Sequence, residues 1–198
     1  MAPQEATQIR KYITSADSTL SDSENVGNEE LQGALQDSAN PDTAAVVRAA
    51  DATRKGYQDA LRNEEIPPEF EDAHHYVITA LGIRAAATED LAEAATGDGE
   101  GFEESVASVD EEYKFSDVII FDHYIPGSER ALEEADRMSD RNYLHEPKPF
   151  MDYEALGPSS VSSQSSSSSS SSSAPEDPSA LRDVGVSSVQ VAGRPLSS

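Results

Sequence analysis

Apolar residues recur at steps of three, four or seven from the start of the chain to about residue 138, which is the spacing of amphipathic α-helices. The first such stripe runs without a proline, but the polar stretch 21–25 and Gly27 predict a kink or a break within it. We therefore expect one long helix that is weakened near its middle. Its apolar stripe consists of Ile9, Ile13, Ala16, Leu20, Gly27, Leu31 and Ala34.

A second helix is predicted after Asn40-Pro41-Asp42, where Asn40 can cap the helix and Pro41 suits its first position. It should end near Ile66-Pro67, because the residue before a proline is pushed out of the α region. The stripe of this helix consists of Val46, Ala50, Thr53, Tyr57 and Leu61.

Pro68 is expected to open a third helix, and the run Thr96-Gly97-Asp98-Gly99 to stop it. This helix has the most regular stripe of the chain, and the stripe includes polar and charged residues. Its members are Phe70, His74, Val77, Leu81, Arg84, Thr88, Leu91 and Ala95.

A fourth helix is predicted up to Pro126-Gly127, followed by a short, acid-rich fifth helix at 129–137. Beyond Asp117 the fourth helix is apolar all round, which predicts burial on more than one side. Residues 142–156, with two prolines and three aromatic residues, are expected to lie across the bundle in irregular structure. The fourth stripe consists of Phe102, Val106, Val109, Tyr113, Ser116, Ile120 and Tyr124.

These elements predict an all-α fold, an antiparallel four-helix bundle with a short fifth helix over residues 1–156, because short connections favour antiparallel neighbours. The unbroken serine run 165–173 indicates a flexible linker at 157–180, since serine cannot bury enough apolar surface to order such a segment. Residues 181–198 are interpreted as a tail. Alternation over 184–191 suggests one strand, which could begin a truncated β module.

Charge changes this picture, because 38 acidic residues stand against 14 basic ones, for a net charge of -24. All but three of the acids and all but two of the bases precede Ser159, so the predicted bundle carries almost all of the net charge. Such a surface repels phosphate, which disfavours nucleic acids and anionic membranes as partners. A protein partner, possibly cationic, remains open. This composition also suits a soluble acidic protein of a halophile or a high-GC genome.

Several kinds of chemistry are excluded or disfavoured. The chain has no cysteine, so disulfides and Cys-ligated zinc or iron–sulfur sites are impossible. It has no Gly-x-Ser-x-Gly nucleophile motif and no glycine-rich phosphate loop. No apolar run approaches the length that spans a bilayer. We therefore expect a protein that is not an enzyme, has no cofactor and has no membrane span within this chain.

Glu71 and His74 are the candidate metal ligands, because the spacing Glu-x-x-His puts a carboxylate and an imidazole on one helix face. Di-iron bundles combine two such motifs with a glutamate from each of two further helices. This sequence has one motif, so a histidine that is hydrogen-bonded beside the helix seam is the simpler interpretation.

Arg84 lies on the stripe of the third helix, so its guanidinium should point toward the bundle interior. A charge in that position needs a partner. Asp117 is the best candidate, because it lies where the fourth helix becomes apolar all round. We predict a structural ion pair between Arg84 and Asp117, joined by Ser116. The alternative is that Arg84 extends to solvent.

Several short motifs resemble uncharacterised envelope proteins of high-GC Gram-positive bacteria. They are Pro67-Pro68-Glu69-Phe70, Ala73-His74, the run 80–84, Leu91 and the run 114–117 followed by an apolar stretch. In those proteins a helical bundle lies outside the membrane after one N-terminal spanning helix, and several continue through a linker into a β-sandwich-like module. The resemblance covers about residues 5–156. Here, however, Met1-Ala2-Pro3 leads directly into the first helix, with no signal or anchor.

The sequence thus favours a non-catalytic helical module that acts through protein–protein contacts at the cell envelope, with the serine run as a tether. Two alternatives stay open, a ligand- or metal-binding four-helix bundle and a soluble acidic protein of a halophile. An extracytoplasmic location requires an anchor upstream of Met1. Without one, the protein would be cytoplasmic.

Overall fold

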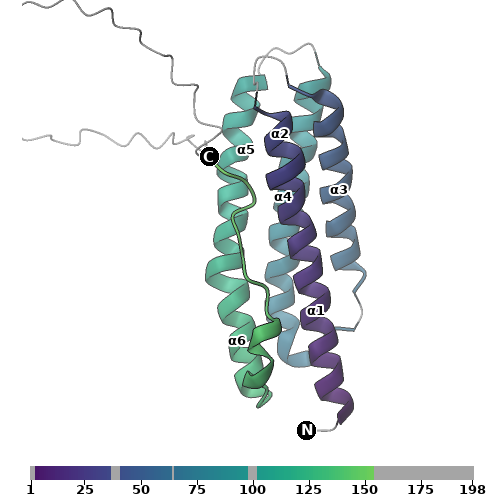
Figure 1. The fold of residues 1–198 in the computed structure, drawn as a ribbon, viewed down its shortest axis with the longest axis vertical. Helices are drawn as coiled ribbons and strands as arrows, with labels where there is room; N and C mark the ends of the chain where they lie inside the picture. Colours follow the sequence, from purple (N-terminus) through teal and green to yellow (C-terminus); the bar gives the residue numbers. More distant parts are fainter. Residues whose placement is uncertain (1–2, 37–40, 64, 98–101, 154–198) are drawn as a thin grey trace, which may run out of the picture. The chain divides into compact units, whose positions relative to one another are not determined.

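The computed structural model describes residues 3–36, 41–63, 65–97 and 102–153, and these form an all-α bundle (Figure 1). The first rod is α1 (Pro3–Asn25), which continues through a π-helical stretch, Val26–Leu31, into α2 (Gln32–Ala34). The second and third rods are α3 (Thr43–Leu61) and α4 (Glu71–Thr96), the latter preceded by a 3₁₀ turn at Pro68–Phe70. The fourth rod is α5 (Phe102–Val118), which continues through the π-helical stretch Ile119–Tyr124 into α6 (Ile125–Glu134).

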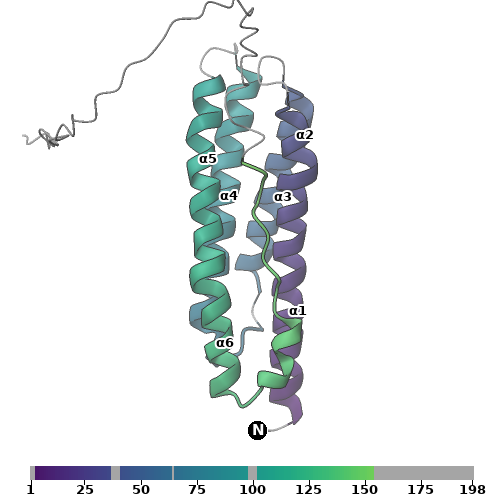
Figure 2. The same ribbon diagram turned by 60° about the vertical axis from the view of Figure 1, so that its left-hand side comes forward.

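Successive rods run in opposite directions, as the colours along the chain show in Figures 1 and 2. The predicted all-α bundle is therefore confirmed. α3 packs against the first rod and against α4, and α4 packs against α5. The predicted weak point of the first rod is a π-helical stretch and not a break, because the backbone at Asn25 and Gln32 stays right-handed helical.

The apolar core is divided into two clusters along the length of the bundle. One surrounds residues such as Ile13, Leu20, Leu81 and Tyr124, and the other surrounds Leu31, Val46, Leu91 and Phe150. Alanine contributes many of the remaining core positions, so the helices approach one another closely. Between the two clusters lie buried polar side chains, which are described below as the candidate site.

The boundaries of α3 differ from the prediction. Pro41 lies before the helix, which begins at Thr43, and the Asp42 carboxylate caps it by accepting a hydrogen bond from the Ala45 N–H at 3.1 Å. The predicted cap, Asn40, lies outside the described residues. The helix ends at Leu61 and not near Ile66, which packs against the core from the connection that follows the helix. Leu61 itself is 50% exposed.

The prediction that Pro126-Gly127 ends the fourth helix is wrong, because the rod continues through α6 to Glu134. A proline lacks the N–H of the usual helical ladder and crowds the carbonyl four residues earlier. In the π-helical stretch directly before α6, the backbone hydrogen bonds already depart from the α-helical pattern. The rod can therefore accommodate the proline ring in the first turn of α6. The true end comes at Asp136, whose φ of 52° is left-handed, with the Arg137 N–H bonded to the Leu132 carbonyl at 2.7 Å.

After the 3₁₀ helix Met138–Tyr143, residues 144–153 form an extended segment that we call the strap. The strap runs lengthwise in the space between α1 and α5 (Figure 2). The expectation that this part of the chain lies across the bundle is therefore wrong. Its backbone follows the two rods because it is held by side chains of both, as shown below.

Within the described ranges, no helix is long and apolar enough to cross a membrane. The predicted linker at 157–180, the strand at 184–191 and the tail at 181–198 lie outside the described residues.

Candidate functional site

Each of the four rods contributes a buried polar side chain near the boundary between the two apolar clusters. These residues, which we call the polar layer, are Ser23, Thr53, Arg84, Ser116 and Asp117. The Thr53 hydroxyl donates to carbonyls of its own helix. The other four come from three different rods and are bonded to one another, so the layer fixes how these rods align along the bundle axis.

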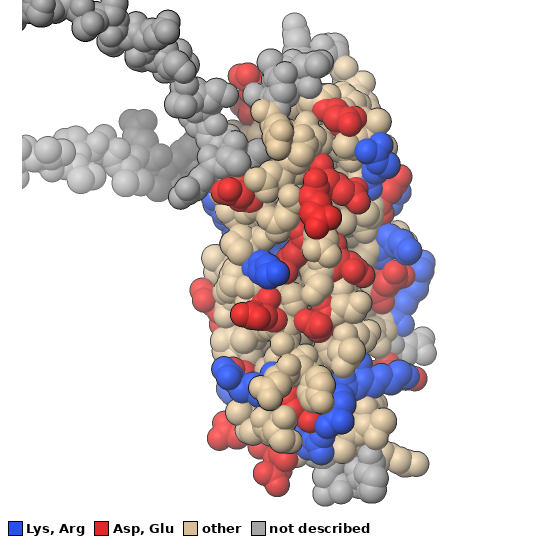
Figure 3. Space-filling model, viewed as in Figure 1, with Lys and Arg blue, Asp and Glu red and all other residues tan. Residues whose placement is uncertain are grey.

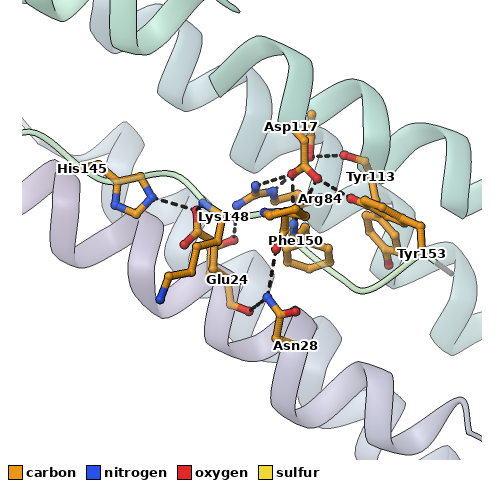
Figure 4. Close-up of polar contacts among 12 residues, drawn as sticks. Glu24, Asn28, Arg84, Tyr113, Asp117, His145, Lys148, Phe150 and Tyr153 are labelled. Atoms are coloured by element: carbon orange, nitrogen blue, oxygen red, sulfur yellow. Dashed lines mark hydrogen bonds and ion pairs between the residues drawn. The ribbon is translucent and has the colours of Figure 1, made fainter. Parts of the chain in front are cut away.

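Arg84 is the centre of the polar layer, with a fully buried side chain. Its Nε donates to Ser116 Oγ at 3.0 Å and its Nη1 to Ser23 Oγ at 3.0 Å. Its Nη2 donates to Asp117 Oδ1 at 2.8 Å. The structure thus brings together the predicted partners Arg84 and Asp117, with Ser116 joined to them as expected (Figure 4).

Asp117 also holds the strap. Its two carboxylate oxygens accept from the Phe150 N–H at 3.1 and 3.0 Å, and Oδ2 accepts from the Tyr153 hydroxyl at 2.5 Å. Burial, together with the bond to this carboxylate, raises the pKa of Tyr153 and keeps its hydroxyl a donor. One buried carboxylate therefore neutralises Arg84 and binds the strap at two points.

Phe150 is the buried aromatic anchor of the strap. The Arg84 guanidinium lies 4.7 Å from the centre of its ring, and the Tyr113 ring lies 4.7 Å away on a tilted plane. On the opposite side the Phe150 backbone lies against Gly27, where an added Cβ would be 2.0 Å from the Phe150 carbonyl oxygen. Glycine is therefore needed at position 27 for the strap to approach the first rod.

A second buried carboxylate, Glu24 of α1, holds the lower half of the strap. Glu24 Oε1 lies 2.7 Å from His145 Nε2 and accepts from the Lys148 N–H at 3.1 Å. The other ring nitrogen of His145, Nδ1, lies 3.0 Å from Asp17 Oδ1. The Asn28 amide then donates to the Pro149 carbonyl at 2.9 Å (Figure 4). Both rods therefore bind the strap through its backbone as well as its side chains.

The start of the strap is fixed by a third buried carboxylate, that of Asp140. It accepts from Arg10 Nη2 of α1 at 2.8 Å and from Arg137 Nε at 2.8 Å. Burial alone would raise the pKa of Asp140, but the two guanidinium partners outweigh burial and lower it. The turn that reverses the chain direction is thereby tied to the first rod.

The pKa of His145 makes the lower half of the strap sensitive to pH. Burial by itself would lower this pKa, but the bonds and charges of Glu24 and Asp17 outweigh burial and raise it above the ordinary value. Protonated His145 therefore stabilises the fold, fully below the unfolded pKa of about 6.5. This contribution is lost as pH rises through the higher folded pKa.

We expect the difference in unfolding free energy between wild type and His145→Gln to shrink as pH rises through this range. Urea unfolding followed by circular dichroism at several pH values measures it, and His75→Gln on the exposed side of α4 is the matched control. The charged groups bonded to the ring are Asp17 and Glu24 of α1, and the pocket beside it is also lined by Glu29, Glu146, Lys148 and Asp152. A difference that grows with pH would contradict the assigned direction.

The two candidate metal ligands, Glu71 and His74, lie in different environments. His74 is buried, with Nδ1 3.3 Å from the Tyr12 hydroxyl and its ring close to the Ala60 backbone, whereas Glu71 is exposed. Burial lowers the pKa of His74 and favours its neutral form. Among the described residues, no three His, Cys, Asp or Glu side chains gather closely enough to hold a metal ion.

Most of the residues that hold the strap were not anticipated from the sequence. The prolines and aromatic residues of 142–156 signal a packed segment, but not the two rods against which it packs. Glu24 and Asp17 are seven residues apart, a spacing that puts them near one helix face, yet among 38 acidic residues that spacing is not distinctive. The residues that were not anticipated are Asp17, Ser23, Glu24, Asn28 and His145, together with the contact between Gly27 and Phe150.

Acidic side chains are spread along the length of the face viewed in Figure 3, and basic side chains gather along its right-hand edge and near its lower end. Chemically, this arrangement can hold an extended peptide by buried carboxylates, with an aromatic anchor between them.

Comparison with protein families, with curated proteins and with solved structures finds no match to this chain.

Proposed function

We propose that the chain is a non-catalytic helical module that acts through protein–protein contacts at the cell envelope, with the serine-rich sequence after the strap as a tether. The single observation that supports this proposal is that the buried polar groups hold the strap. Arg84 is paired with Asp117, and Asp117 and Glu24 bind the backbone of the strap, so these groups fix the strap against the first and fourth rods.

The position of the strap supports the tether in particular. Tyr153, the last described residue, is bonded to Asp117, which lies in the polar layer. The sequence that follows contains the serine run 165–173. A flexible segment that follows a firmly held strap can link the bundle to another binding site.

The proposal is tested by site-specific photocrosslinking in the cells that produce the protein. A photoreactive phenylalanine replaces, one at a time, Phe115, Leu61, Met138 and Tyr143, which are exposed and lie on α5, on α3 and at the two ends of the 3₁₀ helix Met138–Tyr143. A protein adduct of defined mass is expected at one or more positions, with the chain recovered in the envelope fraction. Normal expression without an adduct at any position would contradict protein contact as the function, and recovery in the cytosol alone would contradict the location.

Metal analysis of the purified protein tests the ligand- or metal-binding alternative. The feature that favours this alternative is the buried His74, whose Nε2 has no side-chain hydrogen-bond partner and whose ring lies near the Ala60 backbone. Iron, manganese or zinc that stays bound in stoichiometric amount through gel filtration, and is lost in His74→Gln, would favour the alternative over the proposed function. Metal below one tenth of the protein concentration would leave the contact proposal standing, since a built site retains its ion.

A further inference from the structure

Three apolar side chains lie exposed along the outer face of the fourth rod. Phe115 is 59% exposed, Val118 44% and Phe121 38%, and we call these three residues the outer stripe. They follow one another at steps of three, which places them on adjoining parts of one helix surface. The inner face of the same rod is filled separately, by Val109, Tyr113 and Ile120 among others.

The fold of the bundle does not account for the outer stripe. The sequence predicted burial on more than one side from this apolar run, but in the structure Val118 and Phe121 face outward. In Figure 2, α5 stands at the edge of the bundle, with α4 and the strap on its inner sides. Contiguous exposed apolar residues on a soluble surface mark contact sites more often than scattered ones do.

The charges next to the outer stripe indicate the chemistry of the partner. Glu111 lies four residues before Phe115 and Asp122 four residues after Val118, and both are exposed. The intervening cation, Lys114, is paired with Asp110 and lies 5.1 Å from the centre of the Tyr153 ring. The apolar surface is therefore flanked by carboxylates, and a partner that covers it should bring positive charge to both ends.

A second copy of this chain is a poor occupant for the same reason. Two copies packed through the outer stripe would bring the same carboxylates together, on molecules that each carry a net charge of -24. A basic partner would be attracted by the carboxylates that would repel a second copy. The distance from Glu111 to Asp122 is about 16 Å along the helix axis, or three turns, which suits a helix as the partner element.

We propose that the outer stripe is the docking site for an amphipathic, basic helix of a partner protein. The apolar side of that helix covers Phe115, Val118 and Phe121, and its Lys or Arg residues face Glu111 and Asp122. This inference rests on the proposed function, since it names the surface and the kind of partner for a module that acts through protein contacts.

Fluorescence anisotropy with a labelled, designed peptide of leucine and lysine at helical spacing tests the docking site on the full chain. Wild type should bind the peptide, and Phe115→Ser/Phe121→Ser should weaken binding by about 10-fold or more, because apolar anchors carry most of the energy at such contacts. The matched control Leu61→Ser, at an equally exposed apolar position of α3, should change it by less than about twofold. Circular dichroism verifies that the variants fold.

Charge is tested separately with Glu111→Lys/Asp122→Lys, which keeps the outer stripe and should also weaken binding of the leucine–lysine peptide. A peptide of leucine and glutamate with the same spacing should not bind. Equal binding of the two peptides would overturn the assigned partner chemistry. Equal binding by wild type and Phe115→Ser/Phe121→Ser would overturn the docking site, and so would a dimer in analytical ultracentrifugation that this variant abolishes.

The photocrosslinking experiment distinguishes this inference from the proposed function. Adducts at Leu61, Met138 or Tyr143 but none at Phe115 would overturn the docking site and leave the contact function in place. An absence of adducts at all four positions would overturn the proposed function itself.

Discussion

Replacing Asp117 with alanine should lower the free energy of unfolding by about 3–5 kcal/mol, because it leaves the guanidinium of Arg84 buried without its charged partner. The same change removes the acceptor for the Phe150 N–H and for the Tyr153 hydroxyl. Urea unfolding followed by circular dichroism measures the loss. We expect amide exchange at Phe150 to rise as well, since the strap loses its upper attachment.

Two further variants make this result specific. Asp51→Ala removes the carboxylate of an exposed pair with Arg54 and should cost less than about 1 kcal/mol. Arg84→Met/Asp117→Leu replaces the buried pair by apolar residues and should be more stable than Asp117→Ala, since no charge is left unpaired. A loss below about 1 kcal/mol in Asp117→Ala would show that Arg84 finds water or another partner, and would contradict the structural role of the pair.

Replacing Gly27 with alanine should lower the free energy of unfolding by about 2 kcal/mol, although alanine is the better helix former by about 1 kcal/mol. The new Cβ would lie 2.0 Å from the Phe150 carbonyl oxygen and 2.9 Å from the Phe150 carbonyl carbon. Backbone atoms cannot rotate away as a side chain can, so the strap must move from the first rod. Hydrogen exchange at the amides of Lys148 and Phe150 reports this movement directly.

Gly56 of α3 provides the matched control, because a Cβ there would meet nothing within 4 Å. Gly56→Ala should stabilise the protein by about 0.5–1 kcal/mol, the ordinary gain in helix propensity. The two substitutions are chemically identical and differ in what lies next to the glycine. If Gly27→Ala were also stabilising, the close approach of the strap to the first rod would be incorrect.

The helices could be predicted from the sequence because their signal is local. Periodic apolar positions such as Ile13, Val77 and Val109 mark the inner face wherever the rods pack, whatever their order in space. Arg84 and Asp117 could be paired for a related reason, since a charge on an otherwise apolar stripe needs a partner at a similar level of the bundle. Helix ends were harder to predict than helices, as Pro126 shows. A proline normally ends a helix, but a π-helical stretch can accommodate it.

The path of the strap could not be predicted from the sequence. Its attachments to the first rod join residues more than a hundred positions apart, such as His145 with Glu24. Several attachments also depend on backbone N–H groups, which almost every residue has. Gly27 illustrates the difficulty. In the sequence it reads as a weakness in a helix, whereas in the structure the absence of a side chain is what admits the strap.

The direction of the strap determines how the molecule would respond to mechanical force. Tension applied through the tail would reach Tyr153 first, then Phe150, and only afterwards Lys148 and His145. Pulled away from the bundle surface, these attachments would fail one after another at low force, and the rods would stay folded. Pulled along the bundle axis, the same attachments would share the load and yield together. The direction of the pull would thus decide whether the strap peels away or resists.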